Sequence, residues 1–395
     1  MSSSTRRTLT ILFLALAMRF AVCAYLLQKV PSFSQWGINE AGVIARSLLL
    51  SHTYAAPFHD SHGPSSWLAP IYPLIVAGVF AVFGIQTYAS ALAIIVVNAA
   101  CSSLVAVLLY RIGSEFFSEP AGFAAAMLWA LSPAVAFMPL INWDTCVSTL
   151  LATCAVLLTL RLAAAGASPR NTRFAAAGAM WGLGALSTPV LLAPLPFLTL
   201  WLGWRGKRWK PSTVFALAAC LALLPWTTRN LLVFHKFIPV RSNFWAEMSY
   251  GNLGFKNHAT GNSMEFQTLG EMRFVAVSRE RVLTYVRSHP GEFLKQSLHR
   301  AGEFWIVPEG MWKLSFWLSL LTLTGVCRLA WRRHPAAPML VIIFLTYPVA
   351  YYISFVFSRY RHPIEPLMYL SSATVLVEAG KHWRGKQRLR SVTES

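Results

Sequence analysis

Long apolar segments separated by short, often basic loops are the feature that most constrains how this chain folds. Several approach or exceed the ~20 residues that a helix needs to cross a bilayer. Only 12% of the 395 residues are charged, about half of the roughly 25% found in soluble domains. The sequence therefore predicts an all-α polytopic membrane protein with about ten transmembrane helices. The clear segments lie at about 8–28, 88–110, 121–139, 145–162, 174–188, 190–204, 211–228, 314–331, 336–357 and 364–380.

An eleventh apolar segment, Pro70–Gly84, is ambiguous. Its 15 residues would form a helix about 22 Å long, which is short of the ~30 Å hydrocarbon core. Counting it as a span would reverse the side of every later loop. Leaving it out places the basic loops on the same side as Arg6 and Arg7, as expected for cytoplasmic loops. We therefore predict a juxtamembrane or re-entrant helix on the outer side, with both termini cytoplasmic.

The net charge of +19 has two explanations. A surplus of this size can indicate a nucleic-acid partner, but 18 of the 34 Lys and Arg residues fall in the predicted cytoplasmic loops with only four acids. Basic residues collect in such loops because they set the orientation of membrane proteins. The surplus is therefore mostly an orientation signal, and we expect the bilayer rather than a nucleic acid as partner.

The order of segments predicts four regions. Residues 1–229 form an N-terminal transmembrane core, which includes a first outer loop, 28–87, with juxtamembrane helices. Residues 230–313 form an extracytoplasmic helical subdomain, 314–380 the C-terminal transmembrane helices, and 381–395 a basic cytoplasmic tail. Pro189 divides the segments at 174–188 and 190–204, because proline breaks a helix. A tight hairpin is the favoured interpretation of this pair, and a single long tilted span is the alternative.

Two acids and several arginines are predicted at the outer membrane face. Glu40 in the first outer loop and Asp144 at the start of the fourth span fall on the same side, where two carboxylates suit general-base chemistry or a metal. The alternatives are an acid that reaches water and a helix cap. Arg359-Tyr360-Arg361 ends the ninth span and Arg229 the seventh. Forked guanidinium groups suit a lipid phosphate, although an interface anchor is an alternative for the triplet.

Other signals are weaker. His59, Asp60 and His62 are the only weak metal-ligand candidates, because their spacing matches no specific zinc pattern. Arg19 lies within the first span and should face protein, because a lipid-facing charge is costly. The sequence contains no Walker A loop, no GxGxxG on a strand–helix unit, no HExxH and no GxSxG.

Taken together, these motifs resemble the GT-C superfamily of polytopic glycosyltransferases. The nearest resemblance is to bacterial protein-mannosyltransferase and lipid A aminoarabinose-transferase proteins, which are glycosyltransferase family 39-like. The similarity spans residues ~8–380, and the order and spacing of the motifs carry it. The matching stretches are Glu40–Leu48, Gly63–Pro73, Phe83-Gly84, Asp144, Gly182–Pro189, Leu224–Asn230, Ile238–Asn243, Gly251-Asn252 and Arg359–Pro366.

This resemblance implies an inverting transfer of a sugar, hexosyl or pentosyl, from a polyprenyl-phosphate donor. It implies a bacterial plasma (inner) membrane location with an extracytoplasmic active site. Glu40 maps to the general base, ionised near the usual carboxyl pKa of about 4, and Asp144 to a second acid. The Arg359–Arg361 triplet, with Arg229 and Tyr72, maps to substrate and lipid-phosphate binding.

The resemblance implies no definite cofactor beyond the donor substrate. A divalent metal stays an alternative, and the acceptor is a glycan, a lipid or a protein. Two other functions stay open at this point. One is a transporter or flippase for a lipid-linked substrate, which would need charged or broken helices near the midplane. The other is an envelope-polymer ligase or polymerase.

Overall fold

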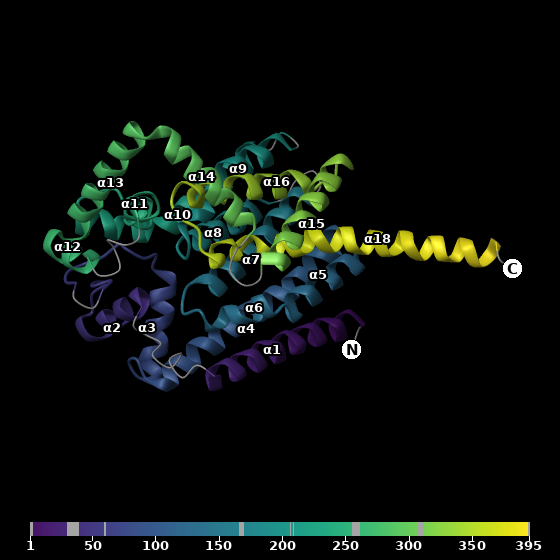
Figure 1. Ribbon diagram of the computed structural model, residues 1–395, viewed down its shortest axis with the longest axis horizontal. Coiled ribbons are helices and arrows are strands. Elements are labelled where there is room, and N and C mark those ends of the chain that lie inside the picture. Colours follow the sequence, from purple (N-terminus) through teal and green to yellow (C-terminus); the bar gives the residue numbers. More distant parts are fainter. Residues whose placement is uncertain are drawn as a thin grey trace.

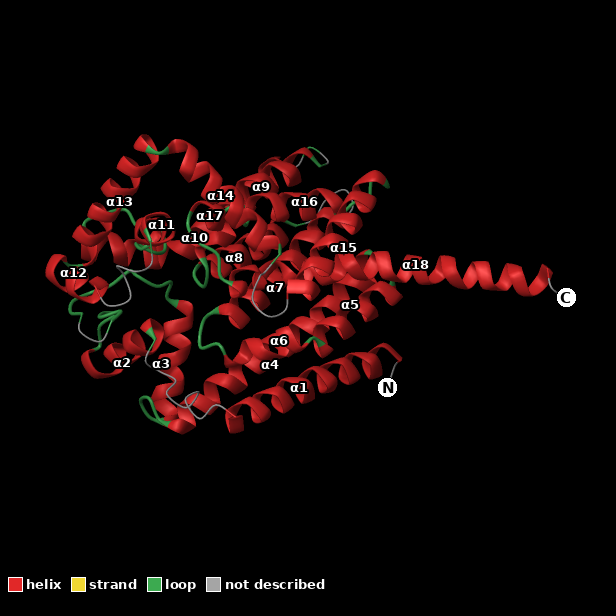
Figure 2. Ribbon diagram, in the orientation of Figure 1, coloured by secondary structure: helices red, strands yellow, loops and turns green. Residues whose placement is uncertain are grey.

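The computed structural model describes residues 3–29, 39–58, 61–165, 170–205, 207, 209–254, 261–306 and 312–393. Helices dominate this part of the chain, as Figure 2 shows, and no strand occurs in it beyond the isolated bridge between Ala55 and Pro64. The helices that contain predicted spans are α1 (Ser3–Lys29), α4 (Tyr88–Phe116), α5 (Glu119–Leu131), α6 (Pro133–Phe137), η2 (Met138–Leu140), α7 (Thr145–Ala164), α8 (Asn171–Ala185), η3 (Pro189–Leu192), α9 (Leu195–Trp204), α10 (Trp209–Phe234), α15 (Trp312–Trp331), α16 (Ala337–Thr346), α17 (Val349–Ile353) and α18 (Glu365–Thr393).

Every apolar segment predicted to span the membrane lies in one of these helices or in a bent series of them. In the described residues, α1, α4, α7, α10 and α15 are each long and apolar enough to cross a bilayer alone. The series α5–α6–η2 passes the same test with a 52° bend, and η3–α9 and α16–α17 are shorter apolar pieces. A multi-pass membrane protein is confirmed, and the number of ten crossings stays a prediction.

The chain reverses direction at Pro189, as the hairpin interpretation requires. A Cβ atom on Gly178 of α8 would lie 1.9 Å from the carbonyl oxygen of Phe215 in α10, so the two helix backbones touch. Gly203 near the end of α9 packs instead on Trp209, where α10 begins. Gly182 meets Ala219 four residues further along both helices, so α8 and α10 run in the same direction. Since α9 ends beside the start of α10, the chain runs out along α8 and back along α9.

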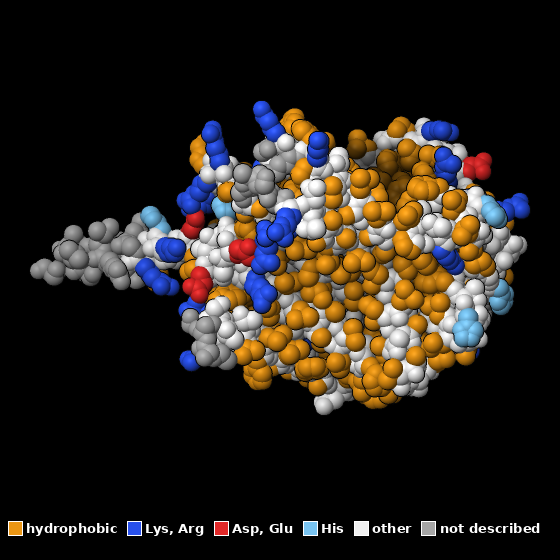
Figure 3. Space-filling view, turned by 180° about the vertical axis from the view of Figure 1, so that it is seen from behind, with side chains coloured by type: hydrophobic (Ala, Val, Ile, Leu, Met, Phe, Trp, Pro, Cys, Tyr) orange, Lys and Arg blue, Asp and Glu red, His pale blue; other side chains and the backbone are white. Residues whose placement is uncertain are grey.

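Ion pairs join the loops that the charge distribution assigned to the cytoplasm. Both described ends of the chain lie at one end of the molecule (Figure 1). Figure 3 shows an apolar band between two ends that carry the charged side chains. Three of the four acids predicted to be cytoplasmic pair with arginines of the same predicted side. These pairs are Arg7–Glu119, Arg161–Glu115, Arg328–Glu378 and Arg332–Glu378.

The predicted boundary between the last span and the tail does not end a helix. Helix α18 continues without a break from Glu365 to Thr393, and Figure 1 shows it projecting beyond the other helices. Nothing in the tail interrupts the helix, because it contains no proline.

A second group of helices forms a layer at the end of the molecule opposite the termini (Figure 1). This end layer consists of α2 (Glu40–Ser51), α3 (Ile71–Phe83), α11 (Phe244–Leu253), α12 (Gly261–Leu269), α13 (Glu271–Ser288) and α14 (Pro290–Trp305). The first two come from the predicted first outer loop and the other four from region 230–313. The ambiguous segment Pro70–Gly84 is therefore the 13-residue helix α3, whose first amide donates to the carbonyl of Leu186 at 3.2 Å.

Arg19 faces protein, as predicted. It is fully buried in α1. Its guanidinium donates to the Ser102 hydroxyl at 2.9 Å and to the carbonyls of Ala15 and Ala130 at 3.0 Å each. Hydrogen bonds to neighbouring helices thus take the place of water around this charge.

Candidate active site

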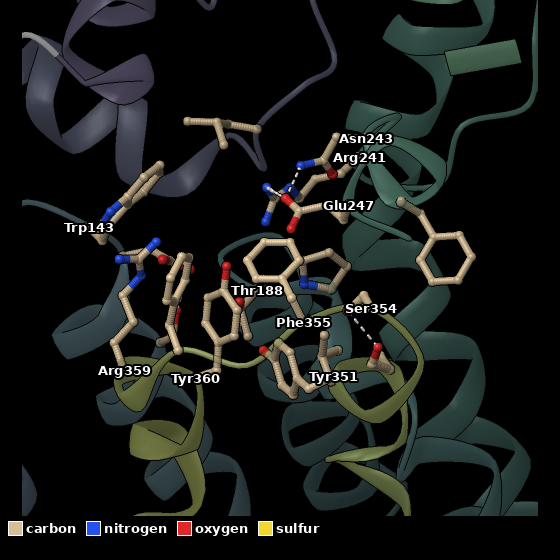
Figure 4. Close-up of a pocket in the computed structure, with 18 of the residues that line it drawn as sticks. Trp143, Thr188, Arg241, Asn243, Glu247, Tyr351, Ser354, Phe355, Arg359 and Tyr360 are labelled. Carbon is tan, nitrogen blue, oxygen red and sulfur yellow. Dashed lines mark hydrogen bonds and ion pairs between the residues drawn. The ribbon is translucent and has the colours of Figure 1, made fainter. Parts of the chain in front are cut away.

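A cavity of about 600 Å³ lies where the end layer meets the apolar helices (Figure 4). Its wall comes from the start of α2, the loop residues Phe58, Trp67 and Leu68, the start of α7, the turn after α8, residues 241–250 around the start of α11, and the segment from α17 to η5 (Ser358–Ile364). Helix α7 begins beside Asp144 at the cavity, and Arg161 near its other end forms one of the ion pairs of the predicted cytoplasmic loops, with Glu115. Its 20 residues span about 30 Å at 1.5 Å per residue.

The two predicted acids line this cavity together. Glu40 is the first residue of α2, and the Asn39 side chain caps that helix by accepting from the Gly42 amide at 3.0 Å. Asn39 also donates to the carbonyl of Asn142, two residues before Asp144. The helix cap thus ties the segment that carries Glu40 to the segment that carries Asp144.

Asp144 stands at the cap position of α7, but its side chain makes no capping hydrogen bond. Its Oδ2 atom instead accepts from the Ser148 hydroxyl at 2.9 Å, and Ser148 lies 2.9 Å from the Ser187 hydroxyl. The capping alternative is therefore wrong for this carboxylate, which faces the cavity.

Burial raises the pKa of both carboxyl groups above their ordinary values. For Glu40 the hydrogen bond to its own backbone and the charges of Arg241 and Arg359 oppose the effect of burial. For Asp144 the opposing influences include Arg241, Ser148 and Arg359. The expectation of a base with an ordinary pKa is thus wrong. A raised pKa brings a general base closer to neutral pH, where proton transfer is most efficient.

Arg359 and Tyr360 reach the same cavity from η5. The Arg359 guanidinium lies over the rings of Trp143 at 4.9 Å, Phe357 at 4.8 Å and Tyr360 at 5.3 Å. In the described part of the chain no acidic side chain pairs with it. An arginine held by aromatic faces alone keeps its hydrogen-bond donors available for an anionic ligand.

Sequence reasoning gave no role to two further charged residues of the cavity, Arg241 and Glu247. Arg241 donates to the carbonyl of Trp67 at 3.0 Å and lies 3.5 Å from Glu247, which also accepts from Asn243 at 2.6 Å. Burial raises the pKa of Glu247, the charge of Arg241 opposes this, and the charge of Glu40 adds to it.

Figure 4 shows Arg241, Asn243 and Glu247 on one side of the cavity and Trp143 and Arg359 on the other. The sequence signal for Arg241 and Asn243 was the resemblance motif Ile238–Asn243, which does not reach Glu247.

The structure separates the two arginines of the Arg359–Arg361 triplet. Arg361 is only 5% exposed and does not line the cavity. It pairs with Glu365 at 3.0 Å and donates to the Ser315 hydroxyl at 2.7 Å and to the carbonyl of Trp305 at 3.0 Å. These bonds fasten η5 to the start of α15 and the end of α14.

Arg229 and Tyr72 lie behind the cavity wall rather than in it. Arg229 donates to the carbonyl oxygens of Ser65 at 2.6 Å and Tyr54 at 2.9 Å. Tyr72 is buried and donates to the side chain of Asn142 at 2.9 Å. Both residues hold segments that contribute side chains to the cavity.

His62, the one metal candidate that lies in the described residues, does not line the cavity. His59 and Asp60 lie outside the described residues, and His62 is exposed. Where the structure describes the chain, no three His, Cys, Asp or Glu side chains are grouped closely enough to hold a metal ion. The described residues thus offer no fitted metal site, and we derive no step through a metal.

Comparisons with known proteins agree with the fold. A model of the family "Dolichyl-phosphate-mannose-protein mannosyltransferase" matches residues 64–228. A search of curated proteins finds no match. Among solved structures, the Archaeoglobus fulgidus oligosaccharyltransferase tethered to an acceptor peptide matches with a TM-score of 0.60 at 15% identity, over 97% of this chain and 50% of that one. The archaeal oligosaccharyltransferase from the same organism, in complex with an inhibitory peptide and a dolichol-phosphate, matches with a TM-score of 0.55 at 14% identity, over 98% and 52%.

These matches confirm the resemblance to GT-C glycosyltransferases and the GT-C fold. The chain spans about half the length of the oligosaccharyltransferase structures. The residues matched by the family model include Asp144 but not Glu40, Arg241 or Arg359. The roles of the individual site residues therefore stay predictions.

Proposed function

We propose that the protein is a membrane glycosyltransferase that moves a sugar from a polyprenyl-phosphate donor to an acceptor hydroxyl, with inversion at the anomeric carbon. The observation that carries this proposal is the cavity itself, where Glu40 and Asp144 face Arg359, which pairs with no acid of the described residues. The match to the mannosyltransferase family model supports it. So do the neighbours whose structures hold a dolichol-phosphate or an acceptor peptide.

The chemistry needs one base and one group that stabilises the leaving phosphate. The Glu40 carboxylate takes the proton of the acceptor hydroxyl, and the hydroxyl oxygen attacks the anomeric carbon. The bond from that carbon to the phosphate oxygen breaks, and the phosphate leaves with the bonding electrons. A single displacement of this kind inverts the anomeric centre. The Arg359 guanidinium stabilises the negative charge that develops on the leaving phosphate.

The surroundings of the two carboxylates favour different roles. Asp144 is oriented by the Ser148 hydroxyl and is therefore suited to a fixed hydrogen bond to the sugar or the acceptor. Glu40 has no side-chain hydrogen bond to another described residue and is therefore available for the acceptor proton. Arg241, on the opposite side of the cavity, supplies a second positive charge near the phosphate (Figure 4).

We place the protein in the bacterial inner membrane, with both termini in the cytoplasm and the cavity on the extracytoplasmic side. The charge distribution along the sequence supports this orientation. So does the position of the cavity, which lies at the end of the molecule opposite the ion pairs between predicted cytoplasmic loops. The acceptor is a glycan, a lipid or a protein that is present on that side.

The test measures sugar transfer from a radiolabelled polyprenyl-phosphate sugar into envelope material by membranes that contain the wild-type protein or Glu40→Gln. We expect transfer and release of polyprenyl phosphate with the wild type, and none with Glu40→Gln. Glu280→Gln is the matched control, because Glu280 is exposed on α13 away from the cavity. Equal transfer by all three proteins would refute the assignment of the base. Movement of the lipid across vesicles without any transfer would favour a flippase instead.

A further inference from the structure

A buried carboxylate outside the cavity links two segments of the cavity wall. Glu271 is the first residue of α13 and is 7% exposed. It accepts hydrogen bonds from the Ser65 hydroxyl at 2.6 Å, from the Ser66 amide and hydroxyl at 2.9 Å each, and from the Ser242 hydroxyl at 2.7 Å. Four donors surround the carboxylate, three on Oε1 and one on Oε2. They make its burial tolerable without an ion pair.

These three serines, the serine cluster, belong to the two segments that place Trp67 and Arg241 in the cavity wall. The Ser65 hydroxyl, which donates to Glu271, also accepts from the Trp67 amide at 3.0 Å. The two segments contact each other directly as well. The Ser242 amide donates to the carbonyl of Ser66 at 2.9 Å, and Arg241 donates to the carbonyl of Trp67 at 3.0 Å. Glu271 thus binds Ser66, the residue before Trp67, and Ser242, the residue after Arg241.

Arg229 holds the same segment through different atoms. It donates to the carbonyl oxygen of Ser65 at 2.6 Å, while Glu271 accepts from the hydroxyl of that residue. Arg229 and Glu271 also attract each other electrostatically. Ser65 is therefore hydrogen-bonded both to the positively charged Arg229 and to the negatively charged Glu271. Neither of these two charged side chains lines the cavity.

Aromatic packing couples α13 to the same part of the wall. The Trp67 ring lies 6.1 Å from the ring of Phe274 in α13 and 5.4 Å from that of Phe266 in α12. Phe58, which also lines the cavity, lies 5.0 Å from Phe266. A displacement of the α13 N-terminus would therefore shift both the hydrogen-bonded residues and the aromatic rings of the cavity wall.

We infer that Glu271 is a positioning residue, which acts through the serine cluster to fix the Trp67 ring and the Arg241 guanidinium at the cavity wall. Its consequence for a phosphate ligand rests on the proposed function, because Arg241 is one of the two arginines offered to the donor phosphate. A carboxylate suits this role because it accepts only, and its charged hydrogen bonds are roughly twice as strong as neutral ones. Glutamine keeps the shape but one carbonyl acceptor only.

The test combines a binding measurement with hydrogen exchange on the full-length protein in lipid nanodiscs. Polyprenyl phosphate is the binding probe, and Glu271→Ala, Glu271→Gln and Ser242→Ala are the variants. Glu280→Ala is the matched control, because Glu280 is an exposed acid on the same helix. We expect Glu271→Ala to weaken binding about ten- to a hundredfold, the effect of losing one hydrogen bond between the Arg241 guanidinium and a charged phosphate. We expect faster amide exchange across residues 63–68 in the same variant.

Partial rescue separates a positioning role from a general loss of structure. Glu271→Gln should recover part of the affinity, and Ser242→Ala should lose a smaller part, with exchange in α7 unchanged in both. If Glu271→Ala does not fold, these two milder variants decide the outcome in the same way. Wild-type affinity and wild-type exchange at 63–68 in the Glu271 variants would overturn the inference. Failure of the wild-type protein to bind polyprenyl phosphate would refute the proposed function. The role of Glu271 would then still be tested by comparing amide exchange at residues 63–68 in its variants with that of the wild type.

Discussion

Arg359 and Arg361 stand two residues apart in one short helix, and the structure predicts opposite consequences for their loss. Arg359 faces the cavity between aromatic rings, whereas Arg361 faces the protein and pairs with Glu365. We compare Arg359→Met with Arg361→Met, because methionine keeps an unbranched apolar chain and removes the guanidinium. The expected outcome is loss of activity without loss of stability in the first variant, and loss of stability in the second.

The magnitudes follow from the contacts of each guanidinium. Removing Arg361 leaves the Glu365 carboxylate, which is 11% exposed, without its arginine partner and with the His362 ring as its remaining side-chain contact. Breaking one side of a buried pair lowers the free energy of unfolding by about 3–5 kcal/mol. Removing Arg359 gives up contacts with aromatic rings that are worth roughly 0.5–1 kcal/mol at partly exposed sites. It also removes a donor to the leaving phosphate, which lowers kcat by about 10²–10³-fold.

The assay pairs thermal unfolding in detergent with the rate of sugar transfer per folded molecule. Arg359→Met should unfold within a degree or two of the wild type and transfer sugar at 1% of the wild-type rate or less. Arg361→Met should unfold at a clearly lower temperature. Its folded fraction should keep most of the transfer rate, measured well below that temperature. Wild-type transfer by Arg359→Met, or equal destabilisation by both substitutions, would refute the division of roles.

The other predictions concern the carboxylates and Arg19. Glu40→Gln should abolish transfer without lowering the unfolding temperature at pH 7. The pKa of Glu40 in the folded protein lies above 4.5, so its contribution to stability declines as pH rises through that pKa. For the same reason the acidic limb of kcat/KM should lie above the range of an ordinary glutamate carboxyl, and a limb within that range would contradict the raised pKa of Glu40. Asp144→Asn should also lower transfer with unfolding unchanged, and full activity would exclude a role for this acid. Arg19→Met should lower the unfolding temperature, because it leaves the carbonyls of Ala15 and Ala130 without this donor, and an unchanged temperature would contradict a structural role.

The helices could be predicted from the sequence because their signal is local. An apolar run flanked by basic residues predicts a span without knowledge of the partners of that span. The order of spans then fixes which loops share a side. This is why Glu40, Asp144 and Arg359, which are far apart in the chain, could be expected at one face. Proline at position 189 marked the reversal between α8 and α9 in the same local way.

The direction of individual side chains could not be predicted in this way. Arg359 and Arg361 fall within one motif, but the turn of η5 sends one into the cavity and the other into the protein. The sequence also predicted a phosphate ligand for Arg229. In the structure its guanidinium instead donates to the carbonyl oxygens of Ser65 and Tyr54. Arg241 and Glu247 were missed because only the packing of α11 and α13 against the first loop brings them to the cavity.

The buried and half-buried charges discussed above differ in how completely they are paired. Arg19, Glu271 and Arg361 each make several hydrogen bonds to protein atoms. Glu40 and Arg359 line the cavity without comparable partners among the residues that the structure describes. A partly buried charge without partners destabilises the fold, so its presence indicates a ligand that completes its interactions. Neutralising a charge of the first group should destabilise the protein, whereas neutralising one of the second should cost activity alone. This contrast separates supporting residues from reacting residues more reliably than their positions in a sequence motif.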